Sequence, residues 1–258
     1  MYREITAHGP VKSPTAWEWL KALDMHRETQ TSLRGTDVSA KGVFRFSVAY
    51  FLGLLILNIL VSPFVDQFQG GLLVQTALMT LVFLFALLVV GGRLRTLLGA
   101  VLVAPALAGE WLSYWRPDLT SSVVIRGGGL LFIGFVVLEF LRFILRAPRV
   151  DFEVLCAGIA TYLMLGLLWC FAYILVDRLA PNSFVFTVGP VSTHSMNDFN
   201  ALYFSFTTLS TIGYGDIIPV SGVARMLAMV EAVFGMFYVT LLIARLVSLY
   251  SSQSPREV

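Results

Sequence analysis

The chain has 258 residues, of which 57% are hydrophobic and only 13% charged, and its formal net charge is +2. A soluble domain of this length rarely has so apolar and so weakly charged a composition. We therefore expect an integral membrane protein that is surrounded by lipid and has no nucleic-acid partner.

The N-terminal segment, residues 1–43, is polar and mixed in charge. It lacks the apolar core of a signal peptide, so we expect it to stay in the cytoplasm. Apolar residues recur there at helical spacing beside charged ones, which predicts a short amphipathic helix at the membrane surface or against a neighbour; they are Trp17, Leu20 and Leu23, beside Glu18, Lys21 and Arg27. A loosely ordered tail is an equally good interpretation.

Six apolar stretches are near the length that crosses a bilayer as a helix. They cover residues 44–64, 71–91, 97–114, 123–146, 153–177 and 222–250. The third contains Pro105 and Glu110, which predicts a kinked or short segment. The other five have no such interruption.

The fourth stretch holds no basic residue between Arg126 and Arg142. Two acidic residues, Glu110 and Glu139, lie near the ends of their stretches. We expect them to pair with Arg126 and Arg142 at the membrane interface.

Residues 197–208 begin with residues typical of a helix N-cap, which predicts a short helix. The run that follows it is Thr211-Ile212-Gly213-Tyr214-Gly215-Asp216, and Pro219 ends it. Glycine at positions 213 and 215 allows backbone conformations that a β-carbon forbids. Such a backbone can turn successive carbonyl oxygens toward one axis, where they replace the water shell of a dehydrating cation.

The run and the helix before it resemble the tetrameric potassium channel superfamily, specifically a bacterial-type channel with six transmembrane segments. The resemblance implies that residues 197–208 form a re-entrant pore helix. It also implies that carbonyls of Thr211, Ile212, Gly213 and Tyr214 bind potassium in a selectivity filter completed by Gly215. No other cofactor is expected.

The resemblance also implies residues that support the filter. Tyr203 and Phe204 would form an aromatic cuff around Tyr214. Some relatives have an acidic residue where Thr207 stands, paired with the carboxylate after the filter; because Thr207 cannot replace it, we expect Tyr203 to donate a hydrogen bond to Asp216.

Two residues of the sixth stretch stand out. Glu231 is ionisable within a membrane segment, so it should face protein or water. We expect it to lie behind the pore helix and to bond Ser205, Thr207 or a backbone group, as a residue that holds the helix. Gly235 allows either a bend of the inner helix or close packing.

Helical spacing from Gly235 defines one face of the inner helix, and we expect this face to line the pore and to gate it by dewetting. The face contains Met236, Val239, Ile243, Ala244 and Val247. A lipid-facing or helix-facing surface is the alternative, because the segment is apolar nearly all round.

Lysine and arginine placement supports one topology. With the filter near the outer surface, as the resemblance implies, the N-terminus, the second connection and the end of the fourth segment lie inside, and these parts carry most basic residues. We therefore expect a multi-pass protein of the cell membrane with both termini in the cytoplasm.

Six segments with one filter resemble voltage-gated channels, but the fourth segment lacks their array of arginines. Steep gating requires several charges per subunit, so we expect weak or no voltage dependence. Only residues 251–258 follow the last segment, and we expect no ligand-binding domain there.

The sequence thus predicts an all-α membrane protein with a cytoplasmic segment (1–43), a four-helix domain (44–147), a pore domain (148–250) and a tail (251–258). A single filter segment requires four copies to close a ring, so we expect a fourfold homotetramer that conducts potassium passively. An unidentified regulatory partner is a further expectation. The alternatives are a subunit of a potassium uptake transporter and a nonconducting sensor that keeps the pore fold. The sequence shows no catalytic constellation, so we expect no enzyme.

Overall fold

The computed structural model describes residues 48–67, 70–89, 93–115, 123–149, 151–189 and 195–253. Within these ranges, six helices are long and apolar enough to cross a membrane: Val48–Val65, Gly71–Val89, Leu94–Leu112, Gly127–Arg146, Phe152–Leu179 and Gly222–Ser248. They coincide with the six predicted segments to within a few residues. The N-terminal segment and its candidate amphipathic helix lie outside the described residues.

The fold is helical, as predicted. After the first helix and the 3-10 helix η1 (Ser62–Gln67) come α2 (Gly71–Val89), α3 (Arg93–Trp115), α4 (Val123–Arg146), α5 (Phe152–Leu179), α6 (Asp198–Leu209) and α7 (Gly222–Gln253). Two strands of three residues, β1 (Phe184–Phe186) and β2 (Ile217–Pro219), form an antiparallel pair.

Helix α3 is not short, so that part of the prediction was wrong. It runs over 23 residues with Pro105 inside it. Proline removes one backbone donor and crowds the preceding turn, and neighbouring helices in a membrane protein compensate for this. Here Gly128 of α4 lies against the Pro105 ring, because a Cβ at Gly128 would approach Pro105 Cβ to 3.2 Å.

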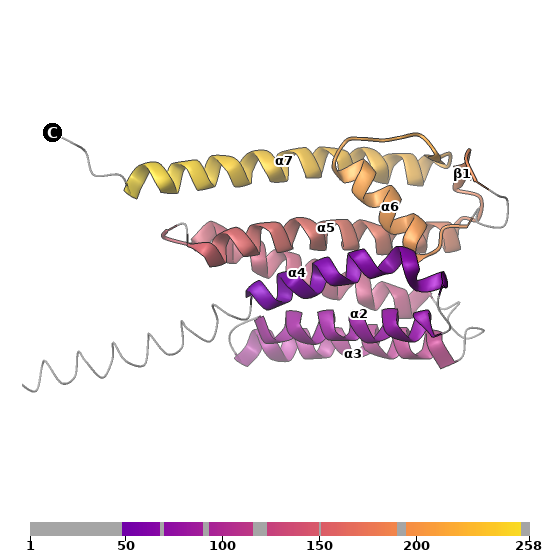
Figure 1. The fold of residues 1–258 in the computed structure, drawn as a ribbon, viewed down its shortest axis with the longest axis horizontal. Coiled ribbons are helices and arrows are strands. Elements are labelled where there is room, and N and C mark those ends of the chain that lie inside the picture. Colours follow the sequence, from indigo (N-terminus) through magenta and orange to yellow (C-terminus); the bar gives the residue numbers. More distant parts are fainter. Residues whose placement is uncertain are drawn as a thin grey trace, which may run out of the picture. The chain divides into compact units, whose positions relative to one another are not determined.

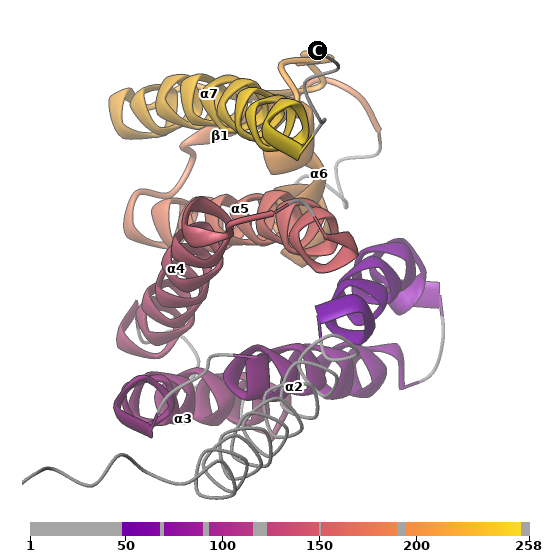
Figure 2. The ribbon, with the colours of Figure 1, turned by 90° about the vertical axis from the view of Figure 1, so that its left-hand side faces the viewer.

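The helices pack in an order that leaves α7 on one side. Helix α4 contacts both α3 and α5, and α6 lies between α5 and α7 at the end where β1 is found (Figures 1 and 2). Aromatic pairs fill the contacts among the first four helices: Phe51 stacks on Phe140, and Phe83 meets Phe132 edge-on.

Helices α5 and α7 differ in how much of their surface the single chain buries. In the apolar 18-residue stretch that marks α5 as a membrane span, 61% of the residues are buried, against only 11% in the corresponding stretch of α7. Since α7 is apolar along most of its length, we expect its exposed surface to meet lipid, other protein chains or a pore.

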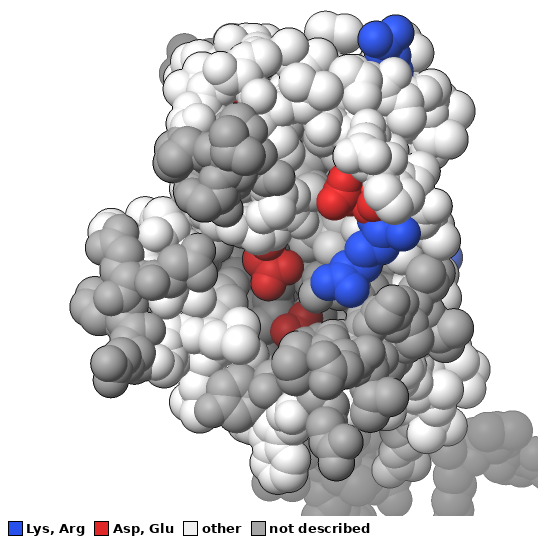
Figure 3. All heavy atoms as spheres, turned by 90° about the vertical axis from the view of Figure 1, so that its right-hand side faces the viewer, with Lys and Arg blue, Asp and Glu red and all other residues white. Residues whose placement is uncertain are grey.

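The end of the molecule at which β1 lies has a different surface. Acidic and basic side chains lie next to each other around a hollow there, among uncharged residues (Figure 3). Exposed charged residues in the connections between α5 and α7 and at their helix ends are Arg178, Asp198 and Arg225. Charged residues such as these are expected where a membrane protein meets water.

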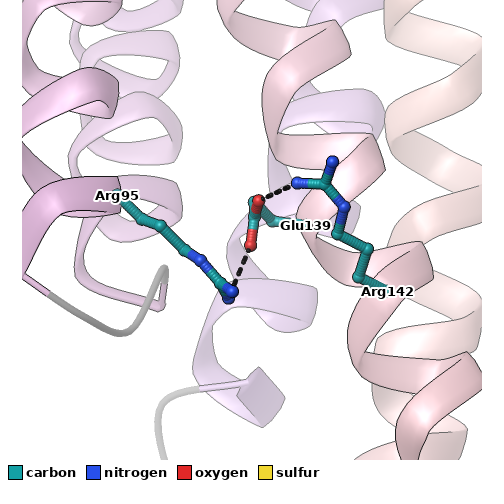
Figure 4. A network of polar contacts seen from close by, with 3 residues as sticks. All are labelled: Arg95, Glu139 and Arg142. Carbon is teal, nitrogen blue, oxygen red and sulfur yellow. Dashed lines mark hydrogen bonds and ion pairs between the residues drawn. The ribbon is translucent and has the colours of Figure 1, made fainter.

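One buried carboxylate ties α3 to α4. Glu139 lies 2.6 Å from Arg142 on its own helix and 3.1 Å from Arg95 of α3, between the two guanidinium groups (Figure 4). The pairing with Arg142 confirms the prediction, whereas Arg95 was not anticipated. The side chain of Arg126 is outside the described residues, so its predicted pairing stays a prediction.

Candidate functional site

Helix α6 begins as the sequence predicted. Asn197 is its N-cap, and its side-chain oxygen accepts a hydrogen bond from the Asn200 backbone N–H at 2.8 Å. This bond satisfies one of the donors that a helix leaves unpaired in its first turn. The Asn200 side chain in turn donates to the Ser195 carbonyl at 2.7 Å, which fixes the direction from which the chain enters the helix.

The end of α6 holds the run that follows it. The Thr207 carbonyl accepts hydrogen bonds from the backbone N–H groups of Ile212 (2.9 Å) and Gly213 (3.1 Å). The Thr207 hydroxyl donates to the Phe204 carbonyl within the same helix, at 3.0 Å. Thr207 therefore positions the run through its carbonyl, and its side chain reaches neither Asp216 nor Glu231.

The backbone of the run alternates in conformation. Thr211, Gly213 and Gly215 have positive φ angles of 61°, 52° and 80°, whereas Ile212 and Tyr214 between them do not. In a β-strand, successive residues point to opposite sides, whereas alternation between left- and right-handed backbone can direct successive carbonyls to one side. The sequence predicted this freedom for the glycines; the left-handed Thr211, which costs roughly 1–3 kcal/mol of strain, was missed.

The run starts at the middle of the helical layer. Gly235 lies midway along the membrane-spanning part of α7, Gly222–Ser248, and a Cβ there would overlap the backbone oxygen of Leu209, the last residue of α6. Non-helical backbone at membrane depth is tolerated only where protein covers it or where it lines a water-filled cavity. In one subunit this run is exposed, with Ile212 at 56% and Tyr214 at 69%.

The C-terminal end of the run is held by the connection after α5. Thr187 donates its backbone N–H to the Asp216 carbonyl at 2.8 Å, and its hydroxyl lies 3.2 Å from the carbonyls of Gly215 and Asp216. The pairing of β1 with β2 continues this contact, with Phe186 opposite Ile217. Sequence analysis missed Thr187 and both strands; the only signal was the short β-type run 184–187.

Asp216 has the donor that the sequence predicted. The Tyr203 hydroxyl donates to Asp216 Oδ2 at 2.8 Å, and the Ile217 backbone N–H donates to Oδ1 at 3.1 Å. Burial, and next the hydrogen bond to Asp216, raise the pKa of Tyr203 to about 12. Tyr203 therefore keeps its proton, and can donate, throughout the physiological pH range.

The predicted aromatic cuff is present in the single chain only in part. The Tyr203 ring stacks on Tyr214, with centroids 6.3 Å apart and an angle of 5°. Phe204 lies elsewhere: its ring meets Tyr173 (4.8 Å) and Phe184 (5.5 Å) edge-on and is buried. The sequence could not distinguish the two sides of α6, because aromatic residues occupy adjacent positions.

Glu231 lies behind α6, as predicted. It is fully buried, and the Ser205 hydroxyl lies 2.6 Å from its Oε1. A second partner, the hydroxyl of Tyr173 on α5, donates to Oε2 and was missed. The group joins α5, α6 and α7.

The predicted face of α7 is exposed in the single chain. Met236, Val239, Ile243, Ala244 and Val247 are all accessible. Gly235 is buried against Leu209, and α7 continues as an α-helix through it. Close packing thus accounts for this glycine, and bending stays a prediction.

Two further contacts hold α7. The Tyr238 hydroxyl donates to the Gly158 carbonyl of α5 at 2.6 Å. Arg245 donates to the carbonyls of Leu145 (3.0 Å) and Ala147 (3.1 Å) at the end of α4. Carbonyls at a helix end lack helical partners, so Arg245 caps α4 from α7.

Comparisons with known proteins place the site in a known context. Residues 161–252 match the family described as Ion channel. Over 68 residues the chain is 40% identical to "Two pore potassium channel c" of Oryza sativa subsp. japonica, a match that covers 26% of this chain and 14% of that protein. No solved structure matches the chain.

These findings agree with the geometry. The matched residues contain most of α5, all of α6, the run after it and nearly all of α7. The chain therefore contains an ion channel pore domain in a multi-pass membrane protein, and the matching family is one of channels and not of enzymes.

Proposed function

We propose that the chain is a subunit of a potassium-selective channel that conducts passively. The carbonyl oxygens of Thr211, Ile212, Gly213 and Tyr214 bind dehydrated potassium, and the Thr211 hydroxyl closes the innermost site. The observation that carries the proposal is the alternating backbone of this run, which begins beside the midpoint of α7. Polar backbone at that depth requires a water-filled pore or a protein cover.

Potassium is the cation that fits best. Rings of backbone carbonyls are how potassium channels replace the hydration shell of the ion, and the relative at 40% identity is named a potassium channel. The C-terminal end of α6 lies at the start of the run, where the negative end of the helix dipole favours a cation.

Four copies complete the site in this proposal. Ion channels of the matching family assemble as multimers, and one run supplies one quarter of a fourfold ring. The low burial of α7 supports an inter-subunit surface along it. The face with Met236, Val239, Ile243, Ala244 and Val247 lines the pore below the filter and closes it by dewetting.

The topology of the proposed channel follows from basic-residue placement. Both termini lie in the cytoplasm of a cell, and the filter opens to the outside through the end at which β1 lies. Residues 1–43 form a cytoplasmic segment, 44–147 the four-helix domain, 148–250 the pore domain and 251–258 the tail. In this proposal an unidentified partner controls the opening of the channel.

Voltage is expected to have little effect on opening. Residues 127–141 of α4 include no lysine or arginine. One charge that crosses 100 mV supplies only about 2.3 kcal/mol, so steep gating needs several charges. Conductance measured against voltage in a planar bilayer should be nearly flat, and a curve that requires three or more charges per subunit would contradict this.

Tyr203→Phe is expected to make the filter lose conduction sooner after opening. The change keeps the ring that stacks on Tyr214 but removes the hydrogen bond to Asp216. A bond to a charged acceptor contributes about 1.5–3 kcal/mol. The measurement is the time course of potassium flux after a gradient is imposed.

Tyr238→Phe is the matched control for that variant. It also removes one phenol hydroxyl, but its partner is Gly158 on α5, away from the filter. Its flux should decay as the wild type does. Equal decay in Tyr203→Phe, Tyr238→Phe and wild type would remove Tyr203 from the filter's support.

Potassium-dependent flux from liposomes, with and without barium, tests the proposal itself. Barium has nearly the radius of potassium and twice its charge, so it should enter the carbonyl sites and block them. Flux that barium stops supports the channel. Flux that depends on an energy source points to a transporter subunit, and absence of flux in several lipids and voltages points to a nonconducting sensor.

A further inference from the structure

The carboxyl group of Glu231 is the most completely enclosed acidic group near the filter. It has no exposed surface, although it lies in the membrane-spanning part of α7. Its partners are the hydroxyls of Tyr173 and Ser205, from α5 and α6. One carboxyl group therefore connects α5, α6 and α7.

The Ser205 hydroxyl has two close oxygen neighbours but only one proton to donate. Its Oγ lies 2.6 Å from Glu231 Oε1 and 2.8 Å from the Gly166 carbonyl oxygen. A serine hydroxyl has one proton, and a carbonyl oxygen only accepts. If Ser205 donates to Gly166, then Glu231 must be the donor to Ser205, and it can donate only as a neutral acid.

The alternative, an ionised Glu231, leaves the group poorly satisfied. Ser205 would then donate to Glu231, and its contact with the Gly166 oxygen would contain no proton. A carboxylate can accept about four hydrogen bonds, yet two hydroxyls are its hydrogen-bond partners here. Burial of an uncompensated carboxylate costs more than two such bonds return.

No positive charge compensates for Glu231 among the described residues. The ion pairs found there involve Glu139 and not Glu231. The titratable groups that face it are Tyr173 and Tyr162 of α5, both phenols. Helix α6 contributes Ser205, which does not titrate, and the turns of α7 on either side of Glu231 carry no charged residue.

We propose that Glu231 is a proton-binding site: it holds its proton in this conformation and completes a chain of hydrogen bonds from Tyr173 through Glu231 and Ser205 to the Gly166 carbonyl. Every donor in this chain has an acceptor, and the chain begins and ends on α5. It fixes α6 between α5 and α7. Glu231 is thus a positioning residue for the filter.

Loss of this proton would change what holds α6. Ser205 would turn from Gly166 to the new carboxylate, and a negative charge would appear behind the pore helix. The consequence for conduction rests on the proposed channel function, whereas the bound proton does not. We expect conduction to fall as the pH rises and the site ionises.

Infrared spectroscopy of the protein in lipid tests the proton directly. The difference spectrum between wild type and Glu231→Gln at neutral pH should contain the C=O stretching band of a protonated carboxylic acid, lost in the variant. Glutamine can still donate an N–H to Ser205, so the fold should survive. Glu139→Gln, which removes an ion-paired carboxylate, should leave the band in place. Absence of the band from wild type would overturn the proposal.

Two variants keep Glu231 and change its partners. Ser205→Ala and Tyr173→Phe each remove one hydrogen bond of Glu231, so each should shift the C=O band, because the frequency of this vibration depends on hydrogen bonding. If Glu231→Gln does not fold, these shifts assign the band to Glu231, because among the described residues only this carboxyl group contacts both hydroxyls. An unchanged band in both would contradict the chain of hydrogen bonds.

Flux measured against pH separates the two parts of the inference. Wild-type flux should decline at high pH, and flux through Glu231→Gln should lose that decline. Equal pH profiles in the two proteins would overturn control of the filter by this proton. If the infrared band is present but no flux is measured at neutral pH, the proton site is supported and the proposed channel is contradicted.

Discussion

Gly213→Ala is expected to abolish selective potassium flux while the tetramer stays assembled. In the structure the φ angle of Gly213 is +52°, and no atom of the subunit lies within 4 Å of an added Cβ. The effect thus comes from backbone conformation. An L-residue in the left-handed region has a conformational strain of about 1–2 kcal/mol. In a tetramer this strain would arise in all four copies of the same ring. The Gly213 carbonyl would rotate to relieve the strain.

The measurement is ion flux together with the oligomeric state in detergent or lipid. Gly222→Ala is the matched control, because Gly222 also has open space around its Cβ and its φ is not in the left-handed range. Flux through this control should match the wild type. A selective current that survives Gly213→Ala would remove this residue from the filter.

Gly235→Ala is expected to stop conduction by displacing α6. A Cβ at this position would overlap the backbone oxygen of Leu209, and a backbone atom cannot rotate away as a side chain can. Overpacking of this kind costs typically about 1–3 kcal/mol. That exceeds the roughly 0.5–1 kcal/mol that alanine gains over glycine within a helix, so the thermal stability of the protein should fall as well.

The same variant distinguishes close packing from bending. If Gly235 acts only as a hinge, alanine should stiffen α7 and alter opening without loss of stability. Gly158→Ala is the control: its Cβ would meet only the end of the Leu242 side chain, at 3.2 Å, which can move. Unchanged stability of Gly235→Ala would contradict the packing argument.

The sequence predicted the features that depend on local pattern. Long apolar stretches predicted the six helices, and Asn197 predicted where α6 begins. The bond between Tyr203 and Asp216 was also predicted, since Asp216 needed a donor and few were near. Glu231 was placed behind α6 because an ionisable group in a membrane helix must face a polar partner.

The features that it missed depend on partners distant in the chain. Arg95 reaches Glu139 across 44 positions, and Tyr173 reaches Glu231 across 58, so no local period reveals them. The strands β1 and β2 have three residues each and pair across α6, too short and too far apart to recognise. Which side of α6 the Phe204 ring occupies depends on its packing against Tyr173 of α5.

The most direct test of the central claim is the reversal potential of the purified protein in a bilayer, with potassium on one side and sodium on the other. A potassium-selective filter at Thr211 to Gly215 predicts a large reversal potential, positive on the sodium side, that balances the diffusion of potassium toward that side, and a current that barium blocks. A current with no shift in reversal potential would mean that sodium passes as readily as potassium, and it would contradict this account.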